Sequence, residues 1–126
     1  MVKLLIVGFG GFLGAIARHS LCAGVGRLHD GHLPLGTFAV NIIGCLAIGA
    51  AMAVAENRPV LSENARLLIV TGLLGAFTTF STFGHETVDL LREGKLPLAG
   101  LYVFGSLALG GGAVILGRLA TRAITA

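Results

Sequence analysis

The sequence predicts an all-α integral membrane protein with four membrane-spanning helices, the third of them broken. Only 12% of its 126 residues are charged and 55% are hydrophobic, where a soluble domain would normally carry about 25% charged residues. The mean hydropathy is +0.91. Short polar segments separate four apolar stretches, each close to the roughly 20 residues with which a helix crosses a bilayer. This composition excludes a water-soluble globule, a disulfide-rich secreted domain and a disordered tail.

All four spans are expected to belong to one membrane domain that covers residues 1–126, because no polar segment between them is long enough to form another domain. The expected spans are residues 4–26, 33–55, 67–92 and 96–117.

The first span is rich in glycine, and Gly10 and Gly14 have the G-x-x-x-G spacing of a helix-packing face. An alternative is a signal peptide, because Lys3, the apolar run and the small residues at 15–17 imitate a cleavage site. Cleavage would leave three spans, and the glycine spacing favours a helix that is retained.

Positive charges are almost evenly divided between the two sides of the predicted bundle. With both termini on one side, that side carries five of them and the other side four: Lys3, Arg58, Arg66, Arg118 and Arg122 against Arg18, Arg27, Arg92 and Lys95. Orientation follows the asymmetry of lysine and arginine. Either one or two positions dominate, or both orientations are inserted and pair as a dual-topology antiparallel homodimer.

Polar side chains inside the spans are candidates for function, because lipid tolerates a polar group only when it is paired or lines a wet cavity. Thr37 and Asn41 in the second span are four residues apart and share one helix face. An asparagine amide offers two N–H donors without a formal charge, which suits a small anion. The alternative is that Asn41 hydrogen-bonds to a neighbouring helix.

The third span carries the strongest local signal, because glycines precede a tract rich in hydroxyl groups. The residues are Gly72 and Gly75, then Thr78, Thr79, Ser81 and Thr82. Such residues weaken a continuous helix, so we predict a break within residues 75–81. Backbone carbonyls freed at a break can coordinate a cation. The alternative is an unbroken helix in which the hydroxyls bond to the preceding turn.

An aromatic residue recurs every third position through this tract, at Phe77, Phe80 and Phe83. Such a stripe is commonly core packing. The positive edges of the rings, beside hydroxyl donors, could instead line an anion path that binds the ion weakly enough to release it.

The fourth span repeats the pattern thinly. Tyr102 and Ser106 lie one helical turn apart, and Gly110 continues their face without a side chain. Hydrogen bonding to neighbouring helices is the alternative for both side chains.

Beyond the break, Glu86, Asp89 and Arg92 form an i, i+3 ladder that is expected to be a solvated pairing at the membrane surface. Gly94 and Pro97 predict a firm helix stop after it.

Arg18 is expected near the end of the first span, where it either reaches the interface or draws anions into a vestibule. Cys22 and Cys45 form no metal-binding cluster and are expected to be small packing residues.

Taken together, these residues resemble the Fluc (CrcB-type) fluoride channel family over nearly the whole chain. The most specific match is the string TTFSTF at residues 78–83. The other matching residues are 10–15, Arg18, Gly36, Thr37, Asn41, Gly44, Gly72 and Gly75.

The resemblance implies a fluoride-selective channel that exports fluoride passively across the inner cell membrane of a microbe. It implies a homodimer with an inverted copy, with fluoride and the lipid bilayer as partners and no nucleic acid. Asn41 would donate hydrogen bonds in the pore, Phe80 and Phe83 would present ring edges, and three side chains would supply hydroxyls: Thr79, Ser81 and Thr82.

The same resemblance implies a structural sodium ion at the dimer centre, held by the backbone carbonyls of Gly75 and Thr78 from both subunits. Tyr102 and Ser106 match a polar track in the fourth span, from which Gly110 departs.

A competing hypothesis is a small dual-topology, proton-coupled multidrug exporter. Such a protein needs a membrane-embedded carboxylate, whereas the first, second and fourth spans contain none and Glu86 lies at the end of the third. A purely structural subunit would not need Asn41 or a hydroxyl-rich break. An enzyme is not expected, because no nucleophile, base and metal ligands converge in any span.

Overall fold

The structure is a computed structural model that describes residues 1–29, 31–57 and 62–125, and these residues form helices and no strand. The elements are α1 (Val2–Leu28), α2 (Leu35–Asn57), α3 (Glu63–Arg66), the π-helical segment η1 (Leu67–Leu74), α4 (Gly75–Phe77), α5 (Phe80–Arg92) and α6 (Leu96–Thr125). Four helical stretches are long and apolar enough to cross a membrane: Val2–Leu28, Leu35–Glu56, Glu63–Arg92 and Leu96–Thr125. The predicted all-α fold with four spans is confirmed.

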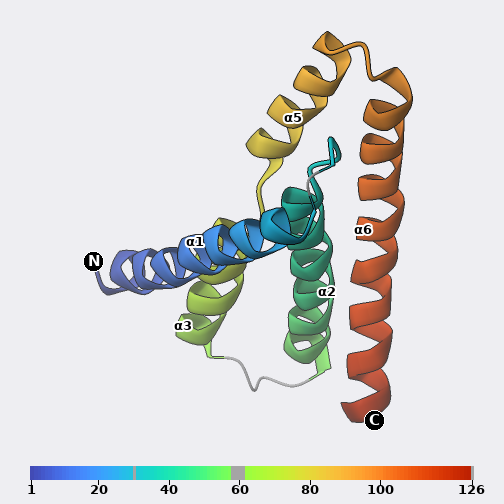
Figure 1. The fold of residues 1–126 in the computed structure, drawn as a ribbon. Coiled ribbons are helices and arrows are strands. Elements are labelled where there is room, and N and C mark those ends of the chain that lie inside the picture. Colours follow the sequence, from blue (N-terminus) through green and yellow to red (C-terminus); the bar gives the residue numbers. More distant parts are fainter. Residues whose placement is uncertain (30, 58–61, 126) are drawn as a thin grey trace.

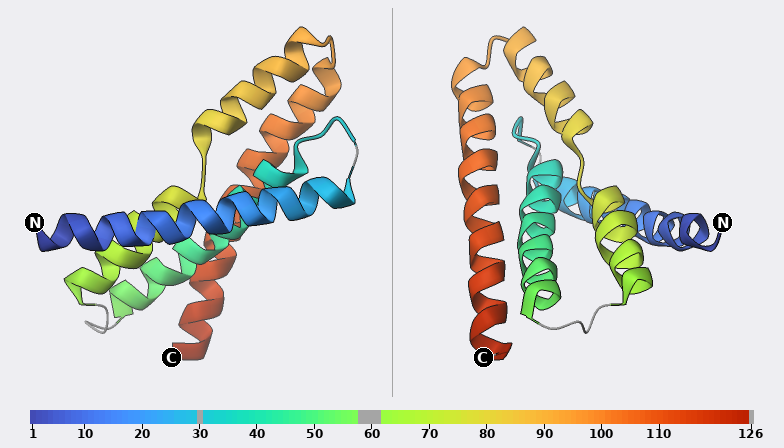
Figure 2. Two further views of the ribbon diagram at one scale, coloured as in Figure 1. Left: turned by 60° about the vertical axis from the view of Figure 1, so that its left-hand side comes forward. Right: turned by 180° about the vertical axis from the view of Figure 1, so that it is seen from behind.

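Helix α2 lies at the centre of the arrangement. Figure 2 shows α6 beside it on one side and α3 with η1 on the other, while α1 crosses the bundle obliquely. Helix α5 leans from the break toward the start of α6 (Figure 1). The two halves of the third span therefore diverge where its helix is interrupted.

Glycines let α1 approach η1 closely. A Cβ atom on Gly10 would lie 2.3 Å from the Leu68 carbonyl oxygen, and one on Gly14 would lie 2.2 Å from the Leu73 carbonyl oxygen. Real Cβ atoms do not approach that closely, so a larger residue would push the helices apart. The predicted packing face at Gly10 and Gly14 is confirmed, and α1 is part of the bundle.

Helices α2 and α6 also pack closely at glycine residues. A Cβ atom on Gly49 would lie 2.2 Å from the Val114 carbonyl oxygen, and one on Gly117 would lie 2.2 Å from the Leu46 carbonyl oxygen. The glycines of both helices therefore allow backbone-to-backbone approach along their length.

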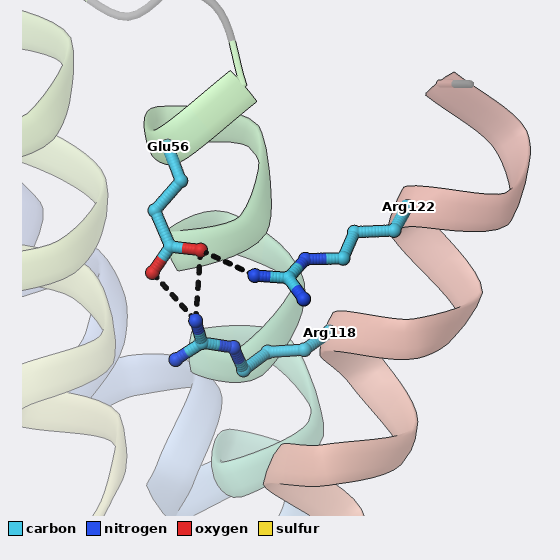
Figure 3. Close-up of polar contacts among 3 residues, drawn as sticks. All are labelled: Glu56, Arg118 and Arg122. Carbon is cyan, nitrogen blue, oxygen red and sulfur yellow. Dashed lines mark hydrogen bonds and ion pairs between the residues drawn. The ribbon is translucent and has the colours of Figure 1, made fainter.

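Helix α6 continues to Thr125, beyond residue 117, where the fourth span was expected to end. The extension places Arg118 and Arg122 beside Glu56 at the end of α2 (Figure 3). Arg118 Nη2 donates to both carboxylate oxygens of Glu56 at 2.6 and 2.7 Å, and Arg122 Nη2 donates to Oε2 at 2.9 Å. These ion pairs join the ends of two helices that already pack together.

The turn between α5 and α6 agrees with the predicted helix stop. Gly94 has a φ of +73°, a left-handed conformation that favours glycine, and its N–H donates to the Leu91 carbonyl. Pro97 lies in the first turn of α6, where its missing N–H leaves no helical hydrogen bond unmade.

Candidate functional site

The third span is broken at Thr78 and Thr79, where both residues have extended backbone. Their φ and ψ angles are −81° and 158° for Thr78 and −149° and 120° for Thr79. The predicted break within residues 75–81 is confirmed, and the alternative of a continuous helix is wrong.

A single side chain of α2 satisfies the backbone at this break. Asn41 Nδ2 donates to the Thr79 carbonyl oxygen at 3.1 Å, and the Thr79 N–H donates to Asn41 Oδ1 at 2.9 Å. One helical turn along, Gly44 leaves room for Thr78, whose Cγ2 lies 2.2 Å from where a Cβ would stand. Both α2 residues therefore fit the broken shape of the third span.

The break leaves the carbonyls of Gly75 and Thr78 without their helical donors. In a continuous helix the Thr79 N–H would donate to the Gly75 carbonyl, and the Thr82 N–H would donate to the Thr78 carbonyl. The first N–H donates instead to Asn41, and the second donates to Thr79 Oγ1 at 3.3 Å. The family resemblance implies a sodium ion at the carbonyls of Gly75 and Thr78, and carbonyls freed in this way are of the type that suits a cation.

A groove of about 380 Å³ opens beside the break. It brings together seven of the predicted site residues: Asn41, Gly75, Thr78, Thr79, Phe80, Phe83 and Ser106. Its other lining residues are apolar or small: Gly44, Cys45, Ile48, Val70, Leu74 and Leu107. None of the described residues that line the groove is charged, so its polarity comes from amide, hydroxyl and backbone groups.

The aromatic stripe divides at the break. Phe77 is buried with 8% exposure, as expected for core packing, whereas Phe80 is 82% exposed at the groove. The ring centroids of Phe80 and Phe83 are 5.8 Å apart, and those of Phe83 and Tyr102 are 5.1 Å apart. The ring planes are tilted by 41° and 46°, between a stacked and an edge-to-face arrangement.

Ser106 contributes a buried hydroxyl to the groove. Its Oγ has no hydrogen-bond partner in the part of the chain that the structure describes. A buried polar group left unpaired costs free energy, so this hydroxyl is a candidate for a partner that the single chain does not supply.

The hydroxyls of Ser81 and Thr82 lie outside the groove lining. Thr79 Oγ1 caps the start of α5 and donates to Thr82 Oγ1 at 3.0 Å, and Ser81 Oγ lies 3.4 Å from it. Ser81 and Thr82 are exposed. Arg18 is half-buried on α1 and does not line the groove.

Glu86 forms two hydrogen bonds near the site that the sequence did not predict. Thr37 Oγ1 donates to Glu86 Oε1 at 2.8 Å, and the Tyr102 hydroxyl donates to Oε2 at 2.7 Å. The expected ladder with Asp89 and Arg92 does not form at Glu86, because this side chain turns toward α2 and α6. Asp89 instead contacts His85 Nδ1 at 2.9 Å.

One feature of the sequence and one of the structure agree with these contacts of the carboxylate. Thr37 shares a helix face with Asn41, and so points toward the third span. Tyr102 is 1% exposed, and a buried tyrosine hydroxyl normally finds a partner. The structure thereby separates the predicted polar track, since Tyr102 contacts Glu86 while Ser106 faces the groove.

Four spans, one of them broken beside an uncharged polar groove, define a multi-pass membrane protein of the kind that handles ions. Residues 5–118 match the family described as CrcB-like protein, Camphor Resistance (CrcB). The chain belongs to this family.

Several relatives are named fluoride-specific ion channel FluC. The protein of Nitratidesulfovibrio vulgaris is 46% identical over 110 residues, which cover 87% of this chain and 89% of the relative. The protein of Acidobacterium capsulatum is 43% identical over 125 residues, which cover 99% and 100%. FluC 1 of Moorella thermoacetica is 48% identical over 106 residues, which cover 84% and 76%. A channel family agrees with the prediction that the chain is not an enzyme.

Proposed function

We propose that the chain forms half of a fluoride channel that exports fluoride passively across the inner cell membrane. The observation that carries the proposal is the groove, which gathers hydrogen-bond donors and ring edges around the break without any charged side chain. Conduction requires a site that an ion can enter and also leave. The names of the relatives specify fluoride as the ion.

Three groups in the groove supply the contacts for a small anion. The Asn41 amide has two N–H bonds and uses one for Thr79, so one remains for the ion. Ser106 adds its unpaired hydroxyl, and Phe80 adds a ring edge.

Other predicted residues act along the route to and from the groove. Thr79, Ser81 and Thr82 supply hydroxyls at the start of α5, and Phe83 and Tyr102 continue the aromatic contacts toward Glu86. Arg18 raises the anion concentration at the vestibule through its charge.

The other half of the channel is an inverted copy of the chain. The groove is open in the single chain, and Phe80 beside it is 82% exposed. Lipid is a poor cover for polar groups, whereas a second groove would complete an enclosed path. The nearly even division of lysine and arginine supports insertion in both orientations.

A structural sodium ion joins the two copies in this proposal. Its ligands are the Gly75 and Thr78 carbonyls of both subunits, and both carbonyls have lost their helical donors at the break. A Cβ at Gly75 would meet only the Val70 carbonyl oxygen, at 3.8 Å, so the surface there is open to a partner. The ion would offset the partial negative charge of the carbonyls.

The multidrug-exporter hypothesis is not favoured by the geometry. Proton exchange requires a carboxylate at the transport site. Among residues 1–29, 31–57 and 62–125, no carboxylate lines the groove, and Glu86 is hydrogen-bonded by Thr37 and Tyr102.

Fluoride efflux from liposomes that contain the purified protein tests the function. A fluoride electrode should record release well above that of empty liposomes. Liposomes loaded with chloride and followed with a chloride electrode should show no release above empty liposomes. Fluoride release no faster than from empty liposomes would overturn the proposal.

A further inference from the structure

The hydrogen bonds at the break assign Asn41 a second role beside lining the ion path. We infer that Asn41 is the positioning residue of the cation site, because it keeps the Thr79 backbone away from the Gly75 carbonyl. The inference rests on the proposed function, of which it specifies the sodium site.

The argument begins with the helical register. The Thr79 N–H is the natural partner of the Gly75 carbonyl, four residues earlier. Asn41 Oδ1 takes this N–H at 2.9 Å, while Asn41 Nδ2 pairs with the Thr79 carbonyl at 3.1 Å. The Gly75 carbonyl therefore stays available only while the asparagine holds both polar groups of Thr79.

Loss of the amide would leave the Thr79 N–H without a partner in a part-buried position between helices. The nearest acceptor in sequence register is the Gly75 carbonyl, which the N–H would regain if α4 wound on by one residue. The Gly75 carbonyl would then accept a helical hydrogen bond and would no longer be free to bind the cation. In a dimer the change would occur at both copies.

No other polar side chain of α2 bonds to the break in the described ranges. Thr37, one turn before Asn41, bonds to Glu86 beyond the break. Gly44, on the same face, makes room for Thr78 but offers no hydrogen bond. Among the described residues of α2, only Asn41 both offers an amide N–H to the groove and bonds to the backbone beside the cation site.

This link predicts that cation binding and the fluoride path are coupled. When sodium fixes the Gly75 carbonyl, the Thr79 N–H remains on Asn41, which orients the remaining amide N–H toward the groove. Such coupling acts in both directions by thermodynamic linkage.

The test is a sodium titration of the full-length purified protein, with N-methyl-D-glucamine replacing sodium at constant ionic strength. The readouts are the dimer fraction and the unfolding temperature. Asn41→Leu, which keeps the side-chain size but removes both hydrogen bonds, should raise the sodium concentration at half-maximal effect by about tenfold or more, within the usual range of coupling between sites. Ile43→Leu, on α2 but outside the groove lining, is the matched control and should not shift it.

A second variant keeps the inference testable if Asn41→Leu does not fold. Asn41→Asp retains an oxygen acceptor for the Thr79 N–H but places a negative charge in the ion path. It should lose fluoride flux and still respond to sodium. An Asn41→Asp protein that no longer responds to sodium would overturn the inference, as would an Asn41→Leu protein that responds like the wild type.

The two proposals fail in different ways. Wild-type protein that conducts fluoride but shows no sodium response would overturn the positioning role and leave the channel function standing. If the wild type responds to sodium, Asn41→Leu shifts that response, and the wild type conducts no fluoride, the channel function would be overturned and the positioning role would stand.

Discussion

The two faces of α2 hold their neighbours by different means. Toward α6, contact depends on Gly49 and Gly117, each of which faces a backbone carbonyl of the other helix. In the described part of the chain, the only side-chain hydrogen bonds between α2 and α6 are those of Glu56 at their ends. Toward the third span, Thr37 and Asn41 both form hydrogen bonds within the bundle.

The difference follows from the state of the neighbouring helix. Helix α6 satisfies its own backbone, so close packing is enough to bind it. The third span is interrupted, and its freed backbone groups need partners from another helix because lipid provides none. Most polar groups that we assign to the ion path, and both carbonyls of the cation site, lie at or near this interruption. Helix α6 adds Tyr102 and Ser106 to the path and packs closely against α2.

The largest expected effect is on fluoride conduction through the groove beside the broken third span. Phe80→Ile removes an exposed ring from the groove, so fluoride efflux should fall to the level of empty liposomes while the protein stays folded and dimeric. Efflux and the dimer fraction are measured on the same preparation.

A control for this substitution lies on α6, where Phe104 is 74% exposed and does not line the groove. Phe104→Ile should conduct. Full conduction by Phe80→Ile would show that the ion path lies elsewhere and would remove the functional contrast between the two faces.

The next largest effect is expected on the stability of the contact between α2 and the continuous helix α6. Gly117→Ala would bring a methyl group to 2.2 Å from the Leu46 carbonyl oxygen, so α6 must move away from α2. We expect a loss of about 1–3 kcal/mol in the free energy of unfolding, as for other overpacked contacts. Thermal unfolding in detergent measures it.

Gly100→Ala is the matched control for this substitution, because a Cβ at Gly100 meets nothing within 4 Å. The control should be neutral or gain up to about 1 kcal/mol from the better helix propensity of alanine. Equal stability of the two variants would mean that close glycine contact is not what binds α6.

Much of this arrangement could be predicted from sequence because its signals are local. The glycine spacing in α1 and the hydroxyl tract after Gly75 are each contained within one span. They predicted the α1 packing face and the break, which the structure confirms at Thr78 and Thr79.

What the sequence could not give depends on how distant segments meet. The partners of Glu86 are Thr37, 49 positions away, and Tyr102, 16 positions away, and the ladder suggested by neighbouring charges pointed in the wrong direction. Likewise, Asn41 was read as an ion donor or as a bond between helices. The two hydrogen bonds between the Asn41 side chain and the Thr79 backbone could be recognised only once the geometry of the break was known.

A smaller effect is expected from the donors that hold Glu86. Tyr102→Phe and Thr37→Val each remove one hydrogen bond to a different oxygen of the carboxylate, and each should cost about 1–2 kcal/mol of unfolding free energy. Because both donors serve one group, their effects should not add. A double-mutant cycle measures the coupling, and strict additivity would indicate that the two donors act independently.

The smallest effect is expected at Glu56, where the contact lies at the ends of α2 and α6 and all three side chains are partly exposed. Exposed ion pairs contribute little and are screened by salt. Glu56→Gln should therefore lower the unfolding temperature slightly at low salt, with no difference at high salt and no change in fluoride efflux. Arg118→Gln should have more effect than Arg122→Gln, since Arg118 makes two of the three hydrogen bonds. A salt-independent loss as large as that of Gly117→Ala would show that this ion cluster, rather than glycine packing, binds α6 to α2, and the contrast between the two faces would then fail.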